Sequence, residues 1–453
     1  TTDPFSHTRA DADWKYPGWL VEVAMYGLFA QFGYAGLNLF TAFFVTLAFA
    51  FVYLACEGHA LLRAFTLVLA AAASAVYWSA RPQIVSFALV AVFAYVLHEF
   101  RWRGVNRLWV LMPLMALWAN AHGGFAIGFI LIALTLAGQM LALLWRWGMR
   151  VFAGERNNPA PGDVSVGGVL RLAGIGLLCA AAVMLNPSGA VMLLYPLETI
   201  SIGVLRDFIQ EWQSPNFHMR EAQPFLWLLL ATLGAVGFSR RRLNVTDFVL
   251  VSGVAYLGFL AGRNVALLAI VAPPVLTRHV RLGWAEVRAR FPRRAASSTT
   301  SLAAPRAALL NWILLGVISL AALIKISIPL QPAVNEAETA RRLPVGAVEY
   351  IRAHRPAGRM FNSYNWGGYL LWALPEYPVY VDGRTDVYDD AFLREYLNTA
   401  FGRAGWQTVL DRYAVNLVVI ESDSLLGDAL QRDGGWVIVY QDSLASVYER
   451  VRH

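Results

Sequence analysis

Cysteine is almost absent from this sequence: Cys56 and Cys179 are the two cysteines among 453 residues. Both lie inside apolar runs, so neither a disulfide framework nor a thiolate metal site is predicted. Charge is scarce as well, because Asp, Glu, Lys and Arg together make up 15% of the chain. Residues 1–19 contain neither the basic region nor the apolar core of a signal peptide. Because the sequence begins at Thr1 rather than Met, we expect further sequence upstream.

Several catalytic and repeat patterns are missing too. The region after residue 330 has no Gly-rich phosphate loop, no close cluster of His and Cys, and no G-x-S-x-G motif. It is therefore not predicted to be a separate enzyme. We find no solenoid period and no inverted duplication along the chain, which disfavours repeat proteins and transporters built from inverted halves.

Apolar residues make up 57% of the chain, which is more than a soluble protein of this length can bury. A window of about 19 residues finds about ten apolar runs, several of them short. They span 35–56, 61–79, 83–99, 107–121, 123–146, 168–186, 224–238, 244–262, 264–277 and 308–330. We therefore predict a multi-span α-helical membrane protein whose transmembrane domain covers residues 1–330.

The net charge of +7 gathers in Arg clusters within alternate connections between these runs. Short connections rich in Arg and Lys stay on the cytoplasmic side of a membrane. This rule predicts a cytoplasmic basic loop at 278–306, outer loops at 1–19 and 187–223, and an outer position for residues 331–453. The membrane explains the basic charge, so no nucleic acid partner is predicted.

The predicted outer connections are rich in acidic, basic, amide and aromatic side chains. Polar groups at helix ends can converge on one site that faces water. The candidates are Asp3, Asp11, Asp13, Arg81, Asn120, His122, Glu211, Arg263 and Asn264. Each also has a simpler interpretation, since Asp caps helices, Arg extends to lipid head groups, and the nearby Trp residues anchor helices at the interface.

The mixture of carboxylates and arginines suits one kind of chemistry. Arginine binds phosphate through paired hydrogen bonds, and a carboxylate can accept a proton from an attacking group. The sequence therefore favours attack of an acceptor on a donor whose leaving group is a phosphate.

Short segments spread over almost the whole chain carry a family resemblance. They are Asp3-Pro4-Phe5-Ser6, Arg81-Pro82-Gln83, Trp118-Ala119-Asn120-Ala121-His122-Gly123-Gly124, Asn186-Pro187, Glu211-Trp212, Arg263-Asn264, Asn365-Trp366-Gly367-Gly368-Tyr369 and Asp382-Gly383-Arg384. Together they resemble bacterial GT-C-type membrane glycosyltransferases, in an uncharacterised branch with an outer C-terminal domain. The chain departs from that pattern because the span that should precede the first outer loop is missing.

The resemblance implies a catalytic Asp in the first outer loop and a sugar donor linked to polyprenyl phosphate. Carried over to this sequence, Asp3 becomes the candidate base, with Asp11 and Asp13 in reserve. Donor and phosphate contacts then fall to Arg81, Asn120, His122, Glu211, Arg263 and Asn264. The implied enzyme is an inverting hexosyl- or pentosyltransferase of the bacterial cytoplasmic (inner) membrane, acting on a glycan, lipid or protein acceptor. No cofactor is implied with certainty, and dependence on a divalent metal stays open.

Residues 331–453 read as a small α/β domain. Strands are predicted at 359–361, 379–381, 416–420, 436–440 and 445–448, and helices at 345–353, 368–373, 391–401, 405–413 and 425–432. Asn365 and Trp366 precede two glycines at a strand-to-helix turn, whereas Asp382 and Arg384 follow a hydrophobic strand. Both places can contact a ligand, although tight packing also explains the glycines.

Two other functions fit the same features. One is a transporter or flippase for lipid-linked sugars, and the other is a catalytically silent membrane scaffold subunit. A transporter is expected to carry ionisable residues near the middle of its spans. The candidate residues instead lie at the ends of the apolar runs, which favours a transferase.

Overall fold

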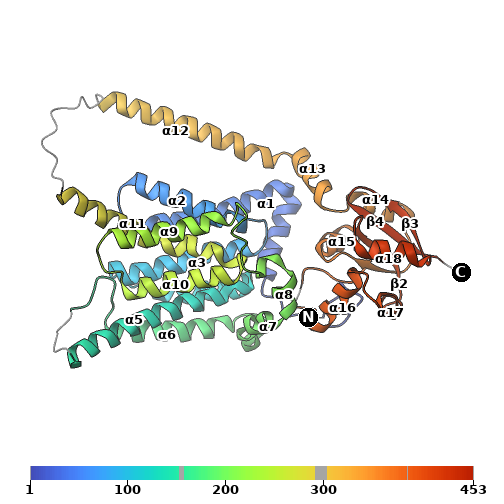
Figure 1. Cartoon of the computed structure of the whole chain (residues 1–453), viewed down its shortest axis with the longest axis horizontal. Helices are drawn as coiled ribbons and strands as arrows, with labels where there is room; N and C mark the ends of the chain where they lie inside the picture. The colour runs from blue at the N-terminus through green and yellow to red at the C-terminus, as the bar shows by residue number, and fades with distance from the viewer. Residues whose placement is uncertain (1, 153–157, 291–303, 385, 452–453) are drawn as a thin grey trace. The chain divides into compact units, whose positions relative to one another are not determined.

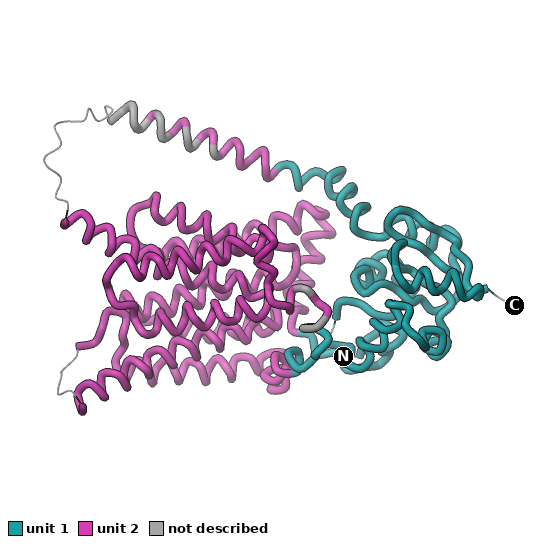
Figure 2. The backbone as a smooth tube through the Cα atoms, in the orientation of Figure 1, with its two compact units in different colours: residues 1–16, 198–205, 327–453 teal, residues 17–197, 206–326 magenta. Residues whose placement is uncertain are grey.

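The computed structural model describes residues 2–152, 158–290, 304–384 and 386–451. By its internal contacts the chain divides into two compact units (Figure 2). Unit 1 comprises Thr1–Tyr16, Glu198–Leu205 and Ser327–His453, and unit 2 comprises Pro17–Leu197 and Arg206–Ile326. This division differs from the predicted boundary at 330, because two segments that precede it pack with the C-terminal residues.

Unit 2 is helical, and most of its helices pack side by side in a bundle (Figure 1). The helices that lie within it or begin or end there are α1 (Trp19–Ala55), α2 (Ala60–Ser74), α3 (Gln83–His98), α4 (Leu111–Ala121), α5 (Ala126–Phe152), α6 (Val166–Val183), α7 (Tyr195–Ser201), α8 (Gly203–Phe208), α9 (Gln223–Phe238), α10 (Val245–Leu260), α11 (Val265–Arg290) and α12 (Ala304–Ser327).

Six helical segments among the described residues are long and apolar enough to cross a membrane. They are Trp19–Ala55, Ala60–Tyr77, Gln83–Arg103, Gly123–Phe152, Val166–Val183 and Gly262–Arg290. Four shorter apolar helices, Leu108–Ala121, Gln223–Phe238, Val245–Leu260 and Ser319–Leu330, fall on the remaining predicted runs. The multi-span helical membrane class is confirmed, and the count of about ten spans stays a prediction.

Helix α1 begins well before the apolar run at 35–56 that the sequence predicts. Its backbone leaves the helical conformation at Gly33, where φ is 58° and ψ is −149°. Glycine adopts such a positive φ without a steric penalty. The break separates residues 19–32 from the following apolar helix, so they form an additional helical segment.

The connections of unit 2 fall into two groups that are each held together by their own contacts. In one group, Trp19 donates to Asn120 (3.0 Å), and the backbone N–H of Gly262 donates to the carbonyl of Gln213 (2.9 Å). We call this the Arg-poor end of the bundle. In the other, the Arg-rich end, Arg103 donates to the carbonyl of Leu54 (2.7 Å). This grouping matches the alternation of connections that the sequence predicts.

The predicted basic loop at 278–306 differs from the structure in its first part. Helix α11 continues to Arg290, and Arg278 is buried within it. The continuation is explained by ion pairs, because Arg278 contacts Asp247 (2.6 Å) and Glu57 (2.9 Å) rather than solvent. Residues 291–303 of the predicted loop lie outside the described residues.

Unit 1 contains a four-stranded sheet with the order β1-β2-β4-β3. Its strands are β1 (Arg359–Asn362), β2 (Val415–Glu421), β3 (Trp436–Gln441) and β4 (Ala445–Arg450); β1 runs parallel to β2, and the other pairs are antiparallel. The helices are α13 (Pro332–Arg342), α14 (Val345–His354), α15 (Gly367–Ala373), α16 (Asp390–Ala400), α17 (Trp406–Arg412) and α18 (Leu425–Asp433). The predicted small α/β domain is therefore present, with α13 as an unpredicted helix.

One predicted strand, 379–381, is not part of this sheet. Its backbone bonds to the side chain of Asn362 instead of to a neighbouring strand. The Asn362 amide accepts from the N–H of Tyr380 (2.8 Å) and donates to the carbonyl of Val381 (2.8 Å). Val379 instead forms an isolated bridge with Ser6. The segment is buried and apolar like a strand, but it bonds to a side chain and to the N-terminal segment.

The N-terminal segment Thr1–Tyr16 is an integral part of unit 1. The N–H of His7 donates to the carbonyl of Val379, and the N–H of Val379 donates to the carbonyl of Phe5, both at 3.1 Å. Thr8 also donates to the carbonyl of Tyr380 (2.6 Å). The predicted first outer loop is therefore held in place by residues that follow it by more than three hundred positions.

Candidate functional site

Asp3 is buried at the junction of the N-terminal segment with the rest of unit 1. Its carboxylate accepts from Arg384 Nη1 (2.8 Å), from the Ser6 hydroxyl (2.5 Å) and from the N–H of Phe5 (3.0 Å). Burial by itself raises the pKa of this carboxyl group, but the bonds from Arg384 and Ser6 outweigh it and lower the pKa. With no exposed side-chain surface, Asp3 has the surroundings of a structural anion.

The other two carboxylates of this segment are exposed. Asp11 occupies a positive φ of 66° in a turn, and Asp13 forms a backbone bridge with Thr2 while its side chain faces solvent. Positive φ is tolerated by Asp better than by most residues. Of the three predicted candidates for the base, Asp11 and Asp13 are therefore the two that are open to solvent and form no ion pair among the described residues.

Arg384 joins two buried carboxylates. It lies within 2.6 Å of Asp382 and 2.8 Å of Asp3, and its guanidinium stacks over Trp14 at 4.8 Å from the ring centroid. Burial by itself lowers the pKa of Arg384, but the hydrogen bonds to Asp382 and Asp3 outweigh it and raise the pKa above its already high value. Asp382 and Arg384, predicted as ligand contacts, are thus committed to each other and to Asp3.

Asp386 lies beside this pair, and its carboxylate accepts from the indole N–H of Trp14 (3.3 Å). Burial raises the pKa of Asp386 from 3.8 to about 6, against weaker opposing effects from hydrogen bonds and Arg384. Ionised Asp386 therefore opposes folding. The sequence draws attention to this residue only through its place after Asp382-Gly383-Arg384.

Changing Asp386 to Asn is expected to stabilise unit 1 above pH 6 and to have little effect below about pH 4. The folded pKa is raised, so the wild-type protein loses stability as pH rises from 3.8 through about 6, and Asn removes that loss. Discounted for partial exposure, the gain is about 1–2 kcal/mol. Hydrogen exchange of the β2 amides measures it, with exposed Asp423→Asn as control. A gain that is the same at pH 4 and pH 8 would contradict this assignment.

Asn365 and Trp366 lie at the predicted strand-to-helix turn between β1 and α15. Asn365 is exposed, whereas Trp366 is buried in the core and donates to the carbonyl of Arg342 (3.2 Å). A Cβ atom added at Gly367 would lie 2.3 Å from the carbonyl oxygen of Val381. Close backbone packing therefore accounts for Gly367 and Trp366, while Asn365 is open to solvent.

Gly367→Ala is expected to destabilise unit 1 by about 1–3 kcal/mol, because backbone atoms of residues 381 and 382 cannot move aside cheaply. The neighbouring Gly368→Ala is a matched control, since its added methyl meets nothing within 4 Å. We expect a change within about 0.5 kcal/mol there. Thermal unfolding measured for both variants checks the difference, and equal effects would refute the packing explanation.

At the Arg-poor end of unit 2, two predicted arginines lie close to one short connection. Arg81 pairs with Glu211 at 3.7 Å, and Arg263 lies over the ring of Trp212 at 4.2 Å from its centroid. Glu211 and Trp212 are adjacent in the chain, which places the two pairs in one neighbourhood. Arg263 is half-buried and has no carboxylate partner among the described residues. Asn264, next to it, donates to the carbonyl of Leu257 (3.1 Å) and so caps α10.

Asn120 and His122 lie at the same end, where α4 meets α5. Asn120 accepts from Trp19 (3.0 Å) and from Asn186 (3.3 Å), so one amide joins three connections. Nδ1 of His122 lies 2.8 Å from the hydroxyl of Ser86, which also accepts from the indole of Trp118 (2.7 Å). These two candidates are held by protein partners, and Ser86 is a contact that the sequence did not suggest.

The structure thus separates the predicted site residues into two groups. Arg81, Glu211, Arg263, Asn120 and His122 belong to unit 2, whereas the aspartates of the first loop and the Asp382 to Arg384 segment belong to unit 1. In the described part of the chain no group of three His, Cys, Asp or Glu residues is placed to hold a metal.

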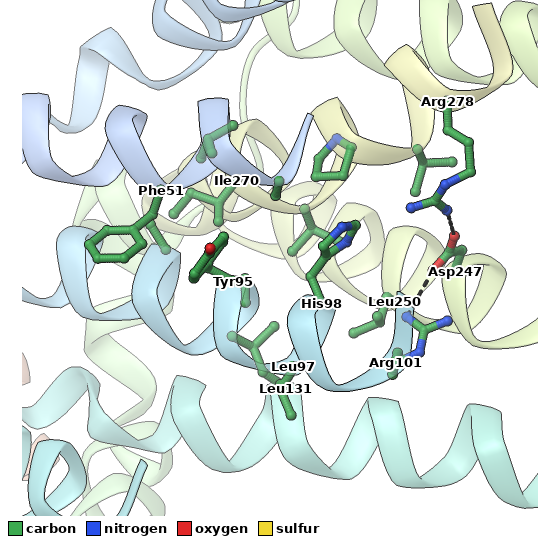
Figure 3. A pocket seen from close by; sticks show the side chains of 17 residues that line it. Phe51, Tyr95, Leu97, His98, Arg101, Leu131, Asp247, Leu250, Ile270 and Arg278 are labelled. Carbon is green, nitrogen blue, oxygen red and sulfur yellow. Dashed lines mark hydrogen bonds and ion pairs between the residues drawn. The ribbon is translucent and has the colours of Figure 1, made fainter. Parts of the chain in front are cut away.

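A third polar cluster was not predicted. Asp247 is buried at the Arg-rich end between Arg101 (2.8 Å) and Arg278 (2.6 Å), and a cavity of about 50 Å³ opens beside them (Figure 3). This cavity is therefore remote from the Arg-poor end. Asp247 lies inside the predicted run 244–262, so a charge within an apolar run was the available signal.

No family model and no curated protein matches the sequence. Solved structures do show similarity. The chain is 14% identical to ArnT from Cupriavidus metallidurans bound to undecaprenyl phosphate, with a TM-score of 0.49 over 96% of this chain and 88% of that one. It is 13% identical to the Archaeoglobus fulgidus oligosaccharyltransferase tethered to an acceptor peptide, with a TM-score of 0.45 over 99% and 67%.

Proposed function

We propose that this protein is a membrane glycosyltransferase that moves a hexosyl or pentosyl group from a polyprenyl-phosphate-linked donor to an acceptor. The observation that carries the proposal is the half-buried guanidinium of Arg263, which rests on Trp212 without a carboxylate partner among the described residues. Arg81 supplies a second positive charge in the same neighbourhood through its contact with Glu211. Guanidinium groups bind phosphate oxygens through charge-assisted hydrogen bonds, so this pair suits a phosphate leaving group.

The proposed reaction is a direct displacement with inversion. A hydroxyl or amide of the acceptor attacks the anomeric carbon while the bond from that carbon to the phosphate oxygen breaks. The phosphate leaves with the electron pair, and the arginines stabilise its added charge. A carboxylate of the first outer loop takes the acceptor proton, and exposed Asp11 and Asp13 are better suited to this role than Asp3.

The arginine distribution supports an outer-face position for the reaction, which in this proposal takes place at a bacterial inner membrane. Because the Arg-poor connections are expected outside, the candidate phosphate contacts and residues 331–453 belong to that side in this proposal. The acceptor is then a glycan, lipid or protein of the cell envelope. In this proposal the boundary between the transmembrane domain and the outer domain stays near residue 330. The exceptions are Thr1–Tyr16 and Glu198–Leu205, which belong to unit 1.

Binding of undecaprenyl phosphate to the purified full chain tests the phosphate contacts. Arg81→Ala and Arg263→Ala should each weaken binding roughly 10- to 100-fold, since a hydrogen bond to a charged group contributes about 1.5–3 kcal/mol. Arg220→Ala is a matched control that removes an exposed charge from the same connection as Glu211. If all three variants bind alike, the arginines do not hold the phosphate and the proposed site is wrong.

A further inference from the structure

The cavity at the Arg-rich end has one polar and one apolar part. Asp247 lies between Arg101 and Arg278 at its polar part, with Phe51 and Tyr95 towards the other end (Figure 3). The walls come from α1, α3, α5, α10 and α11 and consist mainly of aliphatic and aromatic side chains. Such a cavity suits an occupant that has a polar group and a hydrocarbon part.

The charged groups beside the cavity carry an excess of positive charge. Arg101, Arg278 and Arg281 form a continuous chain of ion pairs with the carboxylates of Asp247 and Glu57. Three guanidinium groups thus face two carboxylates. Of these groups, Arg101, Arg278 and Asp247 line the cavity, and the side chains of the two arginines are 3% and 6% exposed. Two poorly solvated guanidinium groups therefore face one carboxylate in the cavity wall, whereas Arg281 is 52% exposed.

The same arginines have buried donors that are left over. Three buried nitrogens have no hydrogen-bond partner among the described residues: Nε of Arg101, Nη2 of Arg278 and the indole nitrogen of Trp102. The guanidinium carbon of Arg278 lies 3.3 Å from the centroid of the Trp102 ring. All three are donors. Leaving a buried donor unpaired costs about 1–3 kcal/mol, so an acceptor is expected there.

We propose that this cavity binds the phosphate group of an anionic phospholipid, whose hydrocarbon part lies against the apolar wall. The unpaired donors need an acceptor, the excess of guanidinium groups in the cavity wall favours an anionic one, and arginine is the residue best matched to phosphate. The site is independent of the proposed transferase reaction, because its residues belong to the opposite end of unit 2. A free phosphate ion shares this chemistry. Water would satisfy the unpaired donors but would not balance the positive charge of the arginines.

Native mass spectrometry of the detergent-purified full chain tests the proposal with dioctanoyl phosphatidylglycerol, dioctanoyl phosphatidylcholine and inorganic phosphate as probes. We expect the chain to retain one phosphatidylglycerol at least fivefold more than phosphatidylcholine. Ala94→Phe fills the apolar wall without touching an ion pair and should abolish this preference. Ala72→Phe, at an exposed position of α2, should leave it unchanged.

Three other results would contradict the binding of an anionic phospholipid in this cavity. Equal retention of both lipids, or a preference that survives in Ala94→Phe, would overturn it and leave water as the occupant. Retention of inorganic phosphate in place of phosphatidylglycerol would overturn the lipid and keep the anion. A thermal unfolding midpoint for Ala94→Phe equal to that of Ala72→Phe excludes misfolding as the reason for lost binding.

Discussion

Asp247→Asn is expected to destabilise unit 2 by roughly 3–5 kcal/mol, because it leaves two buried guanidinium groups facing each other without their shared carboxylate. The cost comes from charges that water cannot reach: the side chain of Asp247 is 5% exposed. Four elements meet at this cluster, since Arg101 follows α3, Asp247 lies in α10, Arg278 in α11 and Glu57 after α1. Reversible unfolding in mixed micelles measures the free energy.

Glu286→Gln provides the matched control for this prediction. Glu286 also accepts from an arginine, at 3.2 Å from Arg241, but that arginine is 65% exposed. Exposed pairs contribute about 0–1 kcal/mol, so this variant should be close to wild type. If Asp247→Asn is no more harmful than Glu286→Gln, the buried chain of ion pairs does not hold these helices together.

Arg384→Met is the second change with a large expected effect. It removes the cation shared by Asp3 and Asp382, whose side chains are 0% and 1% exposed, and leaves both carboxylates buried and unpaired. We expect a loss of roughly 3–5 kcal/mol in the stability of unit 1. Because Arg384 contacts the N-terminal segment directly, that segment should detach first, and the amide of His7, which donates to the carbonyl of Val379, should lose protection from hydrogen exchange.

Arg432→Met is the matched control, which tests whether loss of any arginine charge in unit 1 detaches the N-terminal segment. Arg432 pairs with Asp428 at 3.9 Å, and both side chains are more than half exposed. The variant should retain slow exchange in the N-terminal segment. A protected segment in Arg384→Met would mean that the backbone bonds to Val379 hold it without the ion pair.

Much of the fold could be predicted from the sequence, because apolar runs and alternating strands are local patterns. Each of the ten predicted runs contains or overlaps a helix, and β1, β2, β3 and β4 coincide with predicted strands within a few residues. The start of α1 at Trp19 was missed because its first turns are less apolar than the helix after Gly33. Segment 379–381 looked like a strand because its side chains are buried, but its bonds go to the side chain of Asn362.

The sites were harder to predict, since they depend on contacts between residues far apart in the sequence. Asp3 and Arg384 are separated by 381 positions, and neither motif alone indicates that the two residues neutralise each other. Asp247 is likewise visible in the sequence only as a charge within an apolar run, and its partners Arg101 and Arg278 could be seen only in the structure. Arg81 and Arg263 were predicted as phosphate contacts, and that role stays a prediction. The contact of Arg81 with Glu211 and the stacking of Arg263 on Trp212 could be seen only in the structure.

Transfer of radiolabelled sugar from a panel of polyprenyl-phosphate sugars to envelope acceptors by the purified full chain is the most direct test of the proposed reaction. Wild type and Arg220→Ala should transfer sugar from at least one donor. Arg263→Ala should lower the rate at least 100-fold, and Asp13→Asn or Asp11→Asn should do so if that residue is the base. Donor binding by wild type without transfer to any acceptor, or equal transfer by Arg263→Ala, would contradict a transferase that acts through this phosphate site.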